Sequence, residues 1–154
     1  MQSILVFHNL LRWAIVGFGA WTLFNAISGI IAKRPYSGAD NKSNLLLMIS
    51  CDLQLLLGLI LFFSNSWFEK IKINGMGAVM KNAADRFFIA EHGFMMIIAW
   101  ILVHIGRSAV KKSDENKKHK KMLIFFGIAL LLIFISIPWP NKGEVARPLF
   151  RWFN

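Results

Sequence analysis

The chain has 154 residues, of which 56% are hydrophobic and 17% are charged, and its mean hydropathy is +0.51. This composition excludes a soluble globular core, and a single cysteine excludes a disulfide framework. The net charge of +10 is high enough for a nucleic-acid-binding protein, but the cations gather in a loop between apolar stretches, so we expect no nucleic acid partner.

Four apolar stretches follow one another along the chain, at residues 4–31, 45–63, 87–105 and 122–137. About 20 apolar residues cross the hydrocarbon core of a bilayer as a helix. The first three stretches meet this requirement, and the fourth does so if Trp139 lies at the interface. The sequence therefore predicts one domain, an all-α membrane protein whose four transmembrane helices form a bundle and contact the lipid bilayer.

The first stretch, at residues 4–31, is too long for a cleaved signal peptide and lacks a positive leader. It is also longer than a bilayer requires, so its helix either tilts or extends into the cytoplasm. Mostly small or polar residues recur along it at spacings of three and four: His8, Arg12, Ile15, Gly19, Thr22 and Ala26. They share one helix face, and such faces pack against neighbouring helices in membranes. His8 and Arg12 are therefore expected to point into the bundle.

The second stretch, at residues 45–63, contains Cys51, Asp52 and Gln54. Cys51 belongs to no C-x-x-C-H motif, which excludes covalent attachment of a c-type haem. We expect Gln54 to contact a neighbouring helix. Asp52 needs a partner inside the membrane, and we expect it to pair with His104 of the third stretch. Two interpretations of this pair stay open: it relays protons from the cytoplasm, or it only satisfies the carboxylate.

The third stretch, at residues 87–105, carries a second inward stripe. Its members recur at helical spacing: Phe88, His92, Met95, Met96, Ala99, Val103 and Gly106. His92 follows Arg86 by six residues and His8 follows Ser3 by five, so both lie about 8–9 Å below the same membrane boundary at 1.5 Å per residue. Two imidazoles at one depth can hold a metal or a haem iron between helices. The alternative is that each only forms a hydrogen bond to another helix.

Charged residues lie beside both histidines. Arg12 and Glu91 are at the same outer level, and the sequence predicts that they form a buried ion pair. In a structural interpretation, this pair fixes the register of the helices. In a functional interpretation, Arg12 neutralises a haem propionate, and Arg86, Arg147 or Arg151 shares this role.

The connecting segments set the orientation of the bundle. Residues 107–121 hold seven Lys and Arg residues, so this basic loop is predicted to face the cytoplasm. We expect Asp114, Glu115 and His119, which lie in the same loop, to be solvated. Both termini and the loop at residues 64–85 then face the periplasm, which gives an N-out, C-out arrangement.

The last part of the chain begins with the motif IPWP at residues 137–140. Its two prolines are expected to end the fourth helix abruptly, because neither can continue it. Cations then alternate with aromatic side chains over residues 147–153. Such a segment either lies in the headgroup layer or caps a cofactor from the outer face.

Three motifs taken together resemble a known family. They are HNLLRW at residues 8–13, RFFIAEHGFMM at residues 86–96, and IPWP at residues 137–140 followed by Arg147 and Pro148. The chain resembles small four-span bacterial membrane proteins that are commonly labelled cytochrome b-like. The resemblance covers nearly the whole chain and implies haem b and a bacterial inner membrane. Cytochromes b that hold two haems use four histidines, but only three lie in the apolar stretches here, so we expect at most one bis-histidine site.

The leading hypothesis is that the protein binds one haem b between His8 and His92 and passes electrons between a quinone and a periplasmic partner or a companion subunit. It would be an electron-transfer component rather than a stand-alone enzyme, with no catalytic side chains of its own. Two alternatives stay open. One is a cofactor-free accessory subunit of a larger membrane complex, whose buried polar pairs specify packing, and the other is a proton-coupled carrier that uses Asp52 and His104.

Overall fold

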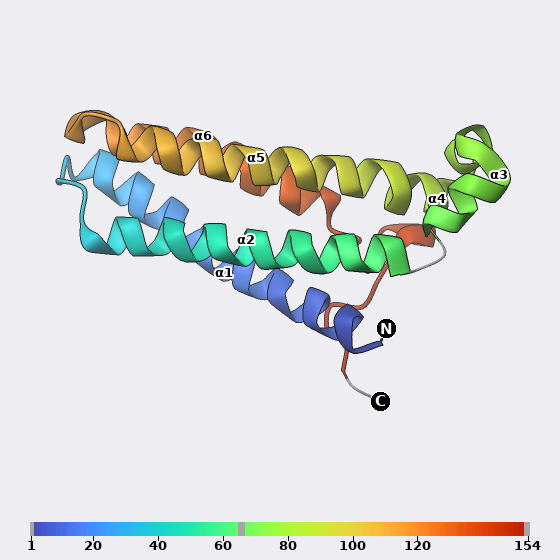
Figure 1. Ribbon diagram of the computed structural model, residues 1–154. Helices are drawn as coiled ribbons and strands as arrows, with labels where there is room; N and C mark the ends of the chain where they lie inside the picture. The colour runs from blue at the N-terminus through green and yellow to red at the C-terminus, as the bar shows by residue number, and fades with distance from the viewer. Residues whose placement is uncertain (1, 65–66, 153–154) are drawn as a thin grey trace.

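The computed structural model describes residues 2–64 and 67–152, and every regular element within them is helical. Figure 1 shows these elements, which are α1 (Gln2–Ile31), α2 (Gly38–Ser64), α3 (Trp67–Lys81), α4 (Ala83–Arg86), the π-helical turn η1 (Phe87–Glu91), α5 (His92–Lys111), α6 (Glu115–Ser136) and the short 3-10 turn η2 (Gly143–Val145). Four helices of the described chain are long and apolar enough to cross a membrane: α1, α2, the continuous segment Ala83–Lys111 and α6. The predicted all-α, four-helix transmembrane bundle is confirmed.

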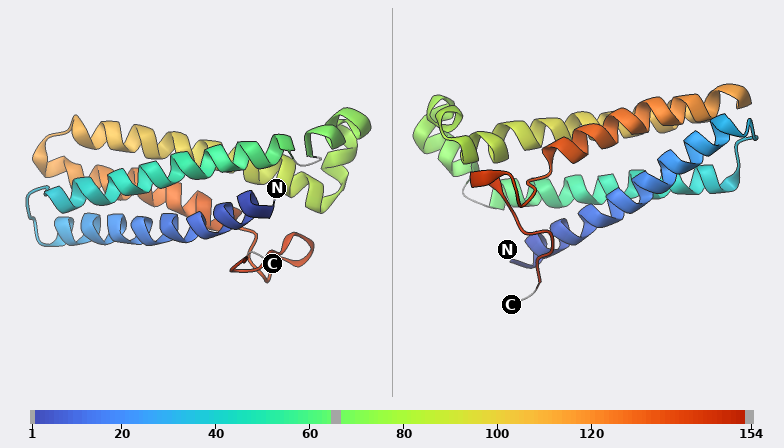
Figure 2. Two further views of the ribbon diagram at one scale, coloured as in Figure 1. Left: turned by 60° about the horizontal axis from the view of Figure 1, so that its bottom comes forward. Right: turned by 180° about the vertical axis from the view of Figure 1, so that it is seen from behind.

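The long helices run alternately in opposite directions, so the molecule has two different ends (Figure 1). The basic end holds the α1–α2 connection at residues 32–37 and the α5–α6 connection at residues 112–114. The tail end holds the start of α1, the short helices α3 and α4, and the segment that follows α6 (Figures 1 and 2). Both ends of the described chain therefore lie on the same side of the bundle. Phe153, the last aromatic residue of the alternating tail, lies outside the described residues.

Helix α1 crosses the bundle obliquely (Figure 2). It lies close to the other helices at the basic end, where Asn25 and Gly29 are buried, and leans away from α5 and α6 toward the tail end. Tilting accommodates a helix that is longer than the hydrocarbon core. Of the two outcomes that the sequence left open, the structure therefore favours the tilted helix.

The core forms where small residues let the helices approach closely. The inward stripe predicted for the first helix is buried at Arg12, Ile15, Gly19, Thr22 and Ala26. A Cβ atom on Gly19 would lie 2.5 Å from the side chain of Leu130, and one on Gly106 would lie 2.6 Å from Cβ of Phe125. These contacts bring α1 and α5 against α6. Close packing of this kind is the main source of helix association in a bilayer, where apolar burial alone gives little advantage.

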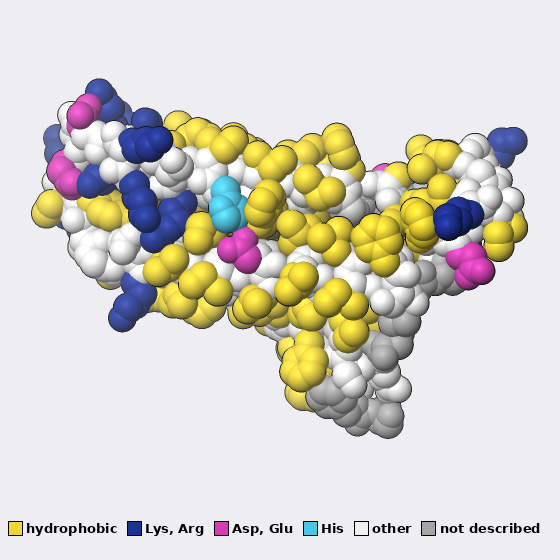
Figure 3. Space-filling view, viewed as in Figure 1, with side chains coloured by type: hydrophobic (Ala, Val, Ile, Leu, Met, Phe, Trp, Pro, Cys, Tyr) yellow, Lys and Arg dark blue, Asp and Glu magenta, His cyan; other side chains and the backbone are white. Residues whose placement is uncertain are grey.

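The face of the bundle seen in Figure 3 carries many apolar side chains along its length. Large side chains such as Phe24, Ile31, Phe63 and Phe94 are more than half exposed, which suits contact with acyl chains. Cationic side chains gather instead at the basic end (Figure 3). This pattern of apolar flanks and a charged end is that of a multi-pass membrane protein.

The predicted loops are shorter than the sequence suggested. Helix α5 continues to Lys111 and α6 begins at Glu115, so the basic residues of segment 107–121 lie mostly on helix ends. The segment at residues 64–85 is largely helical as well, because it contains α3. Gly75 interrupts α3 with a positive φ of 74°, a conformation that glycine adopts without steric cost. The predicted end of the fourth helix before the IPWP motif is confirmed, since α6 ends at Ser136.

A π-helical turn, η1, joins α4 to α5 directly before His92. A π turn contains an extra residue, which rotates the chain before it relative to the helix after it. Phe87 and Ile89 are buried in this turn, whereas the predicted stripe placed Phe88 on the inward face. The stripe holds beyond the turn, where Ala99, Val103 and Gly106 are buried, but Met95 is exposed.

The close packing at Gly29 generates a test of the fold. A Cβ on Gly29 would overlap the ring of His119, which is itself buried and cannot move aside freely. We expect Gly29→Ala to lower the free energy of unfolding by about 1–3 kcal/mol, the usual cost of overpacking. The measurement is thermal unfolding of the purified protein in detergent, followed by circular dichroism.

Gly17→Ala is the matched control, because nothing lies within 4 Å of a Cβ at Gly17 in the same helix. Alanine is a better helix former than glycine by about 0.5–1 kcal/mol, so this variant should unfold at the same or a higher temperature. Equal midpoints for the two variants would contradict the close α1–α6 contact.

Candidate functional site

A large cavity lies among the tail-end halves of α1, α2 and α5. Its volume is about 1010 Å³, and its walls are mainly apolar. Side chains with nitrogen or oxygen atoms line it from α1, α2, α3, η1, α5 and the tail: His8, Asn9, Arg12, Gln54, Trp67, Glu91, His92, Trp100, Arg147 and Arg151. Leu59 of α2 and Phe94 of α5 line the cavity and are also exposed on the outer surface. The cavity therefore opens toward the lipid between these two helices.

The structure brings His8 and His92 together at this cavity. The centres of their imidazole rings are 6.5 Å apart, and the ring planes meet at 68°. His8 comes from α1 and His92 begins α5, directly after η1. The expected convergence of two histidines from separate helices is therefore present.

A hydrogen bond fixes the ring of His92. Its Nδ1 atom lies 2.9 Å from the carbonyl oxygen of Ser136, and because a carbonyl oxygen only accepts, Nδ1 must carry the proton. The Nε2 atom of the neutral ring then keeps its lone pair. No described residue forms a hydrogen bond with this Nε2. The carbonyl of Ser136 is free to accept because it lies in the last turn of α6, where helical carbonyls lack partners.

His8 is held from its backbone and not through its ring. The carbonyl oxygen of His8 accepts a hydrogen bond of 2.9 Å from Nε2 of Gln54, so Gln54 forms the helix contact expected of it. The Nδ1 atom of His8 is buried and has no hydrogen-bond partner among the described residues. A buried polar atom without a partner is costly, which marks this ring as incomplete without a further ligand or water.

Arg12 does not form the predicted ion pair with Glu91. Its Nη2 atom donates to the carbonyl oxygen of Leu149 in the tail at 2.5 Å, and Trp13 donates to the same oxygen at 3.0 Å. Glu91 instead pairs with Arg86 at 2.8 Å. The physical reason is the π turn, because its five-residue repeat brings side chains at this spacing to one face. The Arg12–Glu91 prediction is wrong.

Three arginines at the cavity lack an acidic partner. Arg12, Arg147 and Arg151 all line it, and no described carboxylate lies within ion-pair distance of them. Arg147 lies over the ring of Phe88 at 4.5 Å, and burial lowers the pKa of its guanidinium. Arginine nevertheless stays charged. The cavity therefore has an uncompensated positive rim, which favours a ligand with anionic groups.

Asp52 and His104 form the pair that the sequence predicts. Oδ1 of Asp52 accepts from Nε2 of His104 at 2.8 Å and from Nε1 of Trp100 at 2.6 Å. The ring centres of Trp100 and His104 are 4.5 Å apart. The pair is not buried, however, since 40% of the Asp52 side chain and 37% of the His104 side chain are exposed. The pair was expected inside the bundle, but it lies on the lipid-facing surface between α2 and α5.

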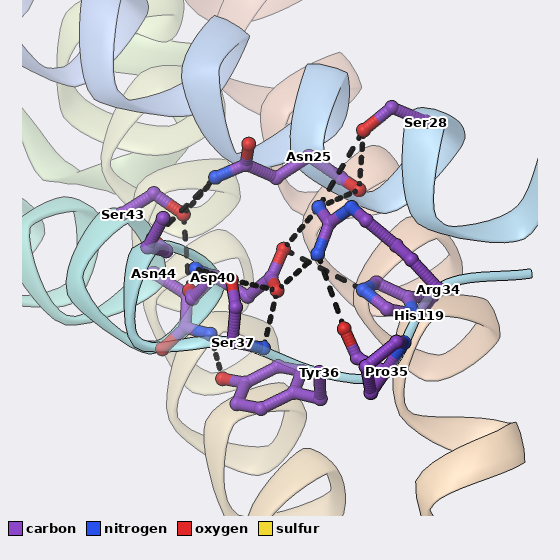
Figure 4. A network of polar contacts seen from close by, with 11 residues as sticks. Asn25, Ser28, Arg34, Pro35, Tyr36, Ser37, Asp40, Ser43, Asn44 and His119 are labelled. Carbon is purple, nitrogen blue, oxygen red and sulfur yellow. Dashed lines mark hydrogen bonds and ion pairs between the residues drawn. The ribbon is translucent and has the colours of Figure 1, made fainter. Parts of the chain in front are cut away.

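A polar network at the basic end, centred on Asp40, is a feature that the sequence reasoning missed (Figure 4). Asp40 is fully buried and accepts hydrogen bonds of 2.7 and 2.8 Å from Arg34. The backbone and hydroxyl of Ser37 each donate to it at 2.7 Å. Ser37 and Asp40 are three residues apart at the start of α2, which is the spacing of a helix capping box. That motif was the available signal.

His119 belongs to this network, although it was expected to be solvated. It is buried, and its Nε2 atom lies 3.5 Å from Oδ1 of Asp40. The cause is the length of α6, which begins at Glu115 and carries His119 into the bundle against Gly29.

The titrating groups in the nearby α1–α2 connection are shifted in ways that fit the network. Hydrogen bonds to Asp40 raise the pKa of Arg34. Burial raises the pKa of Tyr36, whose hydroxyl oxygen accepts a hydrogen bond of 2.8 Å from Asn44. Arg34 thus stays charged and Tyr36 stays neutral, and the network closes the basic end of the bundle.

The described residues contain no group of three or more His, Cys, Asp or Glu side chains able to hold a bare metal ion. Comparison of the chain with protein-family models, with curated proteins and with solved structures found no match. The function is therefore inferred from the geometry of the cavity and its two histidines.

The Asp40 network generates a second test. Asp40→Ala removes the acceptor of four hydrogen bonds and leaves Arg34 unpaired, so we expect the free energy of unfolding to fall by about 2–3 kcal/mol. Asp114→Ala is the matched control, because Asp114 pairs with Lys117 in solvent and its side chain makes no capping bond. Its midpoint in thermal unfolding should match that of the unmodified protein. A similar loss in both variants would contradict a central role for Asp40.

Proposed function

We propose that this protein is an electron-transfer protein of the bacterial inner membrane, or such a subunit of a respiratory complex, and that it binds one haem b between His8 and His92. The observation that carries the proposal is the pair of imidazole rings, from α1 and α5, whose centres are 6.5 Å apart at the wall of a large cavity.

The distance between the rings suits one shared iron. A first-row metal ion lies about 2.0–2.1 Å from an imidazole nitrogen, so two rings on opposite sides of one ion have centres about 6 Å apart. The 68° angle between the planes is compatible with this arrangement, because each ring can rotate about its bond to the ion. Two histidines alone do not complete a site for a bare ion, which favours a cofactor that brings its own equatorial ligands.

The donor atoms are also suitable. A metal-binding histidine commonly donates its other ring N–H to a backbone carbonyl, which fixes the tautomer. The hydrogen bond between Nδ1 of His92 and Ser136 has this form. His8 lines the same cavity, and its buried Nδ1 atom has no hydrogen-bond partner among the described residues.

The size and charge of the cavity fit the cofactor. Its volume of about 1010 Å³ is at the upper end of the range of about 300–1,000 Å³ for small-molecule and cofactor sites. Its apolar walls suit a porphyrin, and Arg12, Arg147 and Arg151 offer positive charge to two propionates. The tail is fastened at Leu149 by Arg12 and Trp13, which supports the expectation that it caps the cofactor.

The haem would supply one-electron chemistry, and the protein would supply its surroundings. The two histidines would hold the iron, the helices would exclude water and lower the local dielectric, and the arginines would hold the propionates. By the positive-inside rule, the basic end faces the cytoplasm, so the site lies near the periplasmic face. This location suits exchange of electrons with a periplasmic partner or a companion subunit. A membrane quinone would be the second redox partner.

Absorbance spectra test this proposal. The protein purified in detergent from haem-replete cells should show a Soret band that shifts on reduction with dithionite. His8→Ala and His92→Ala should each abolish or shift this band, since each removes a side chain that would hold the iron. His104→Ala is the matched control and should leave it unchanged, because His104 pairs with Asp52 on the lipid-facing surface. A colourless unmodified protein would overturn the proposal and leave the cofactor-free accessory subunit as the better explanation.

The unpaired arginines generate a second prediction for the loaded protein. A nearby cation destabilises the ferric state, which carries one more positive charge than the ferrous state. Arg147→Gln should therefore lower the haem reduction potential by tens of millivolts in a spectroscopic redox titration. Arg86→Gln is the control, because Arg86 is already paired with Glu91. The haem reduction potential should change less in this variant than in Arg147→Gln. The opposite order of the two shifts would argue against propionates at Arg147.

A further inference from the structure

We propose that Asp52, Trp100 and His104 form a binding site for the head group of a lipid-soluble quinone, which enters from the bilayer between α2 and α5. This inference rests on the proposed function for its redox role, and it names the membrane carrier and the place where that carrier binds. The binding itself is a separate claim that can be tested without the haem.

Two aspartates of α2 differ in how their carboxylates are satisfied. Asp40 is fully buried, and both of its carboxylate oxygens have partners. Asp52 uses only Oδ1, which accepts from both Trp100 and His104. Its Oδ2 atom accepts no hydrogen bond from any described residue, and 40% of the side chain is exposed. A carboxylate needed only for packing would be expected to resemble Asp40.

His104 presents a second open position. Its Nε2 atom contacts Asp52, while no described residue forms a hydrogen bond with its Nδ1 atom. The two open atoms therefore lie on neighbouring side chains and offer one carboxylate acceptor and one imidazole nitrogen to the same outer surface. Figure 3 shows an imidazole and a carboxylate side by side on this face, with apolar side chains around them.

Depth in the membrane restricts what can bind there. Asp52 lies 14 residues after the start of α2 and 12 before its end, which places it about 20 Å from either end at 1.5 Å per residue. Acyl chains at this depth offer no hydrogen-bonding groups, and lipid headgroups remain at the surface. The ligand must therefore be apolar enough to enter the hydrocarbon core and must carry oxygen atoms of its own.

A quinone has this chemistry in both of its redox forms. The carbonyl oxygen of the oxidised form can accept from Nδ1 of His104 when that ring carries both protons, because the proton on Nε2 is already donated to Asp52. The hydroxyl of the reduced form can donate to the free oxygen of Asp52. A flat aromatic head group can also stack on the indole of Trp100, in an offset arrangement typical of ring pairs. The isoprenoid tail would remain among the acyl chains.

The place of the cluster relative to the cavity supports this assignment. Trp100 lines the cavity that holds the two histidines, and it also donates to Asp52. Cys51 and Gln54, which flank Asp52 in the sequence, line the same cavity. The lipid-facing cluster therefore adjoins this cavity. His104 follows His92 by 12 residues, so a quinone bound here would lie about 18 Å along α5 from His92, and it would reach this place without leaving the bilayer.

Binding of menaquinone-4 to the purified protein in lipid nanodiscs tests the inference. Quinones quench indole fluorescence, so titration of the tryptophan emission gives a dissociation constant. Asp52→Asn and His104→Gln should each raise this constant at least tenfold, which corresponds to about 1.4 kcal/mol. Asp114→Asn is the matched control, because it makes the same chemical change at an exposed residue of the α5–α6 connection. Its constant should equal that of the unmodified protein.

Four outcomes are decisive. Loss of binding in the two site variants, with normal binding in the control, supports the site. Equal constants in all four proteins overturn it. Conversion of a dimer into a monomer by Asp52→Asn and His104→Gln, without saturable quinone binding, also overturns it and assigns the cluster to a contact between copies. A colourless protein that still binds menaquinone-4 through Asp52 would contradict the haem proposal while leaving this site intact.

Discussion

The bilayer offers no hydrogen-bond partners to the groups inside it, so each polar side chain in the four spans must find its partner in the protein or in a ligand. Much of this molecule follows from that constraint. The Asp40 carboxylate is enclosed by Arg34 and Ser37, and Gln54 of α2 reaches the backbone of His8 in α1. These satisfied groups hold particular helices together at particular registers.

The same constraint gives meaning to the groups that are not satisfied. Nδ1 of His8 and Nε of Arg12 are buried without a hydrogen-bond partner among the described residues, and Asp52 exposes a free carboxylate oxygen to lipid. The first two belong to residues of one cavity, and Asp52 lies just beyond its wall. Partnerless polar groups are rare in folded proteins and mark places where a ligand, water or partner belongs. Asn9 and Gln54, which also line the cavity, each carry one more such atom, whereas Nε2 of His119 lies at the basic end beside Asp40.

The two ends of the molecule differ for a physical reason. At the basic end, small residues such as Gly29 and Gly106 let the helices pack closely, and the Asp40 network closes the connections. Toward the tail end, α1 leans away and η1 rotates the start of α5 (Figure 2). The space created there is lined by aromatic and apolar side chains and covered by the tail. A closed end and an open end in one short bundle provide both stability and room for a ligand.

The sequence by itself determined the fold class, because continuous apolar stretches of this length match helices, which cross a bilayer with their backbone hydrogen bonds satisfied internally. Helical spacing also identified the inward face of α1, and equal depth identified His8 and His92 as a pair. Only the tertiary structure decided which polar groups meet. Arg12 reaches the tail carbonyl of Leu149 and not Glu91, because the π turn pairs Glu91 with Arg86. The π turn itself depends on local backbone energetics, which the spacing of residues does not reveal. The tertiary structure also placed His119 inside the bundle and the Asp52–His104 pair at the lipid-facing surface. These positions depend on the rotation and tilt of the helices, which are set by packing between helices and not by any one helix alone.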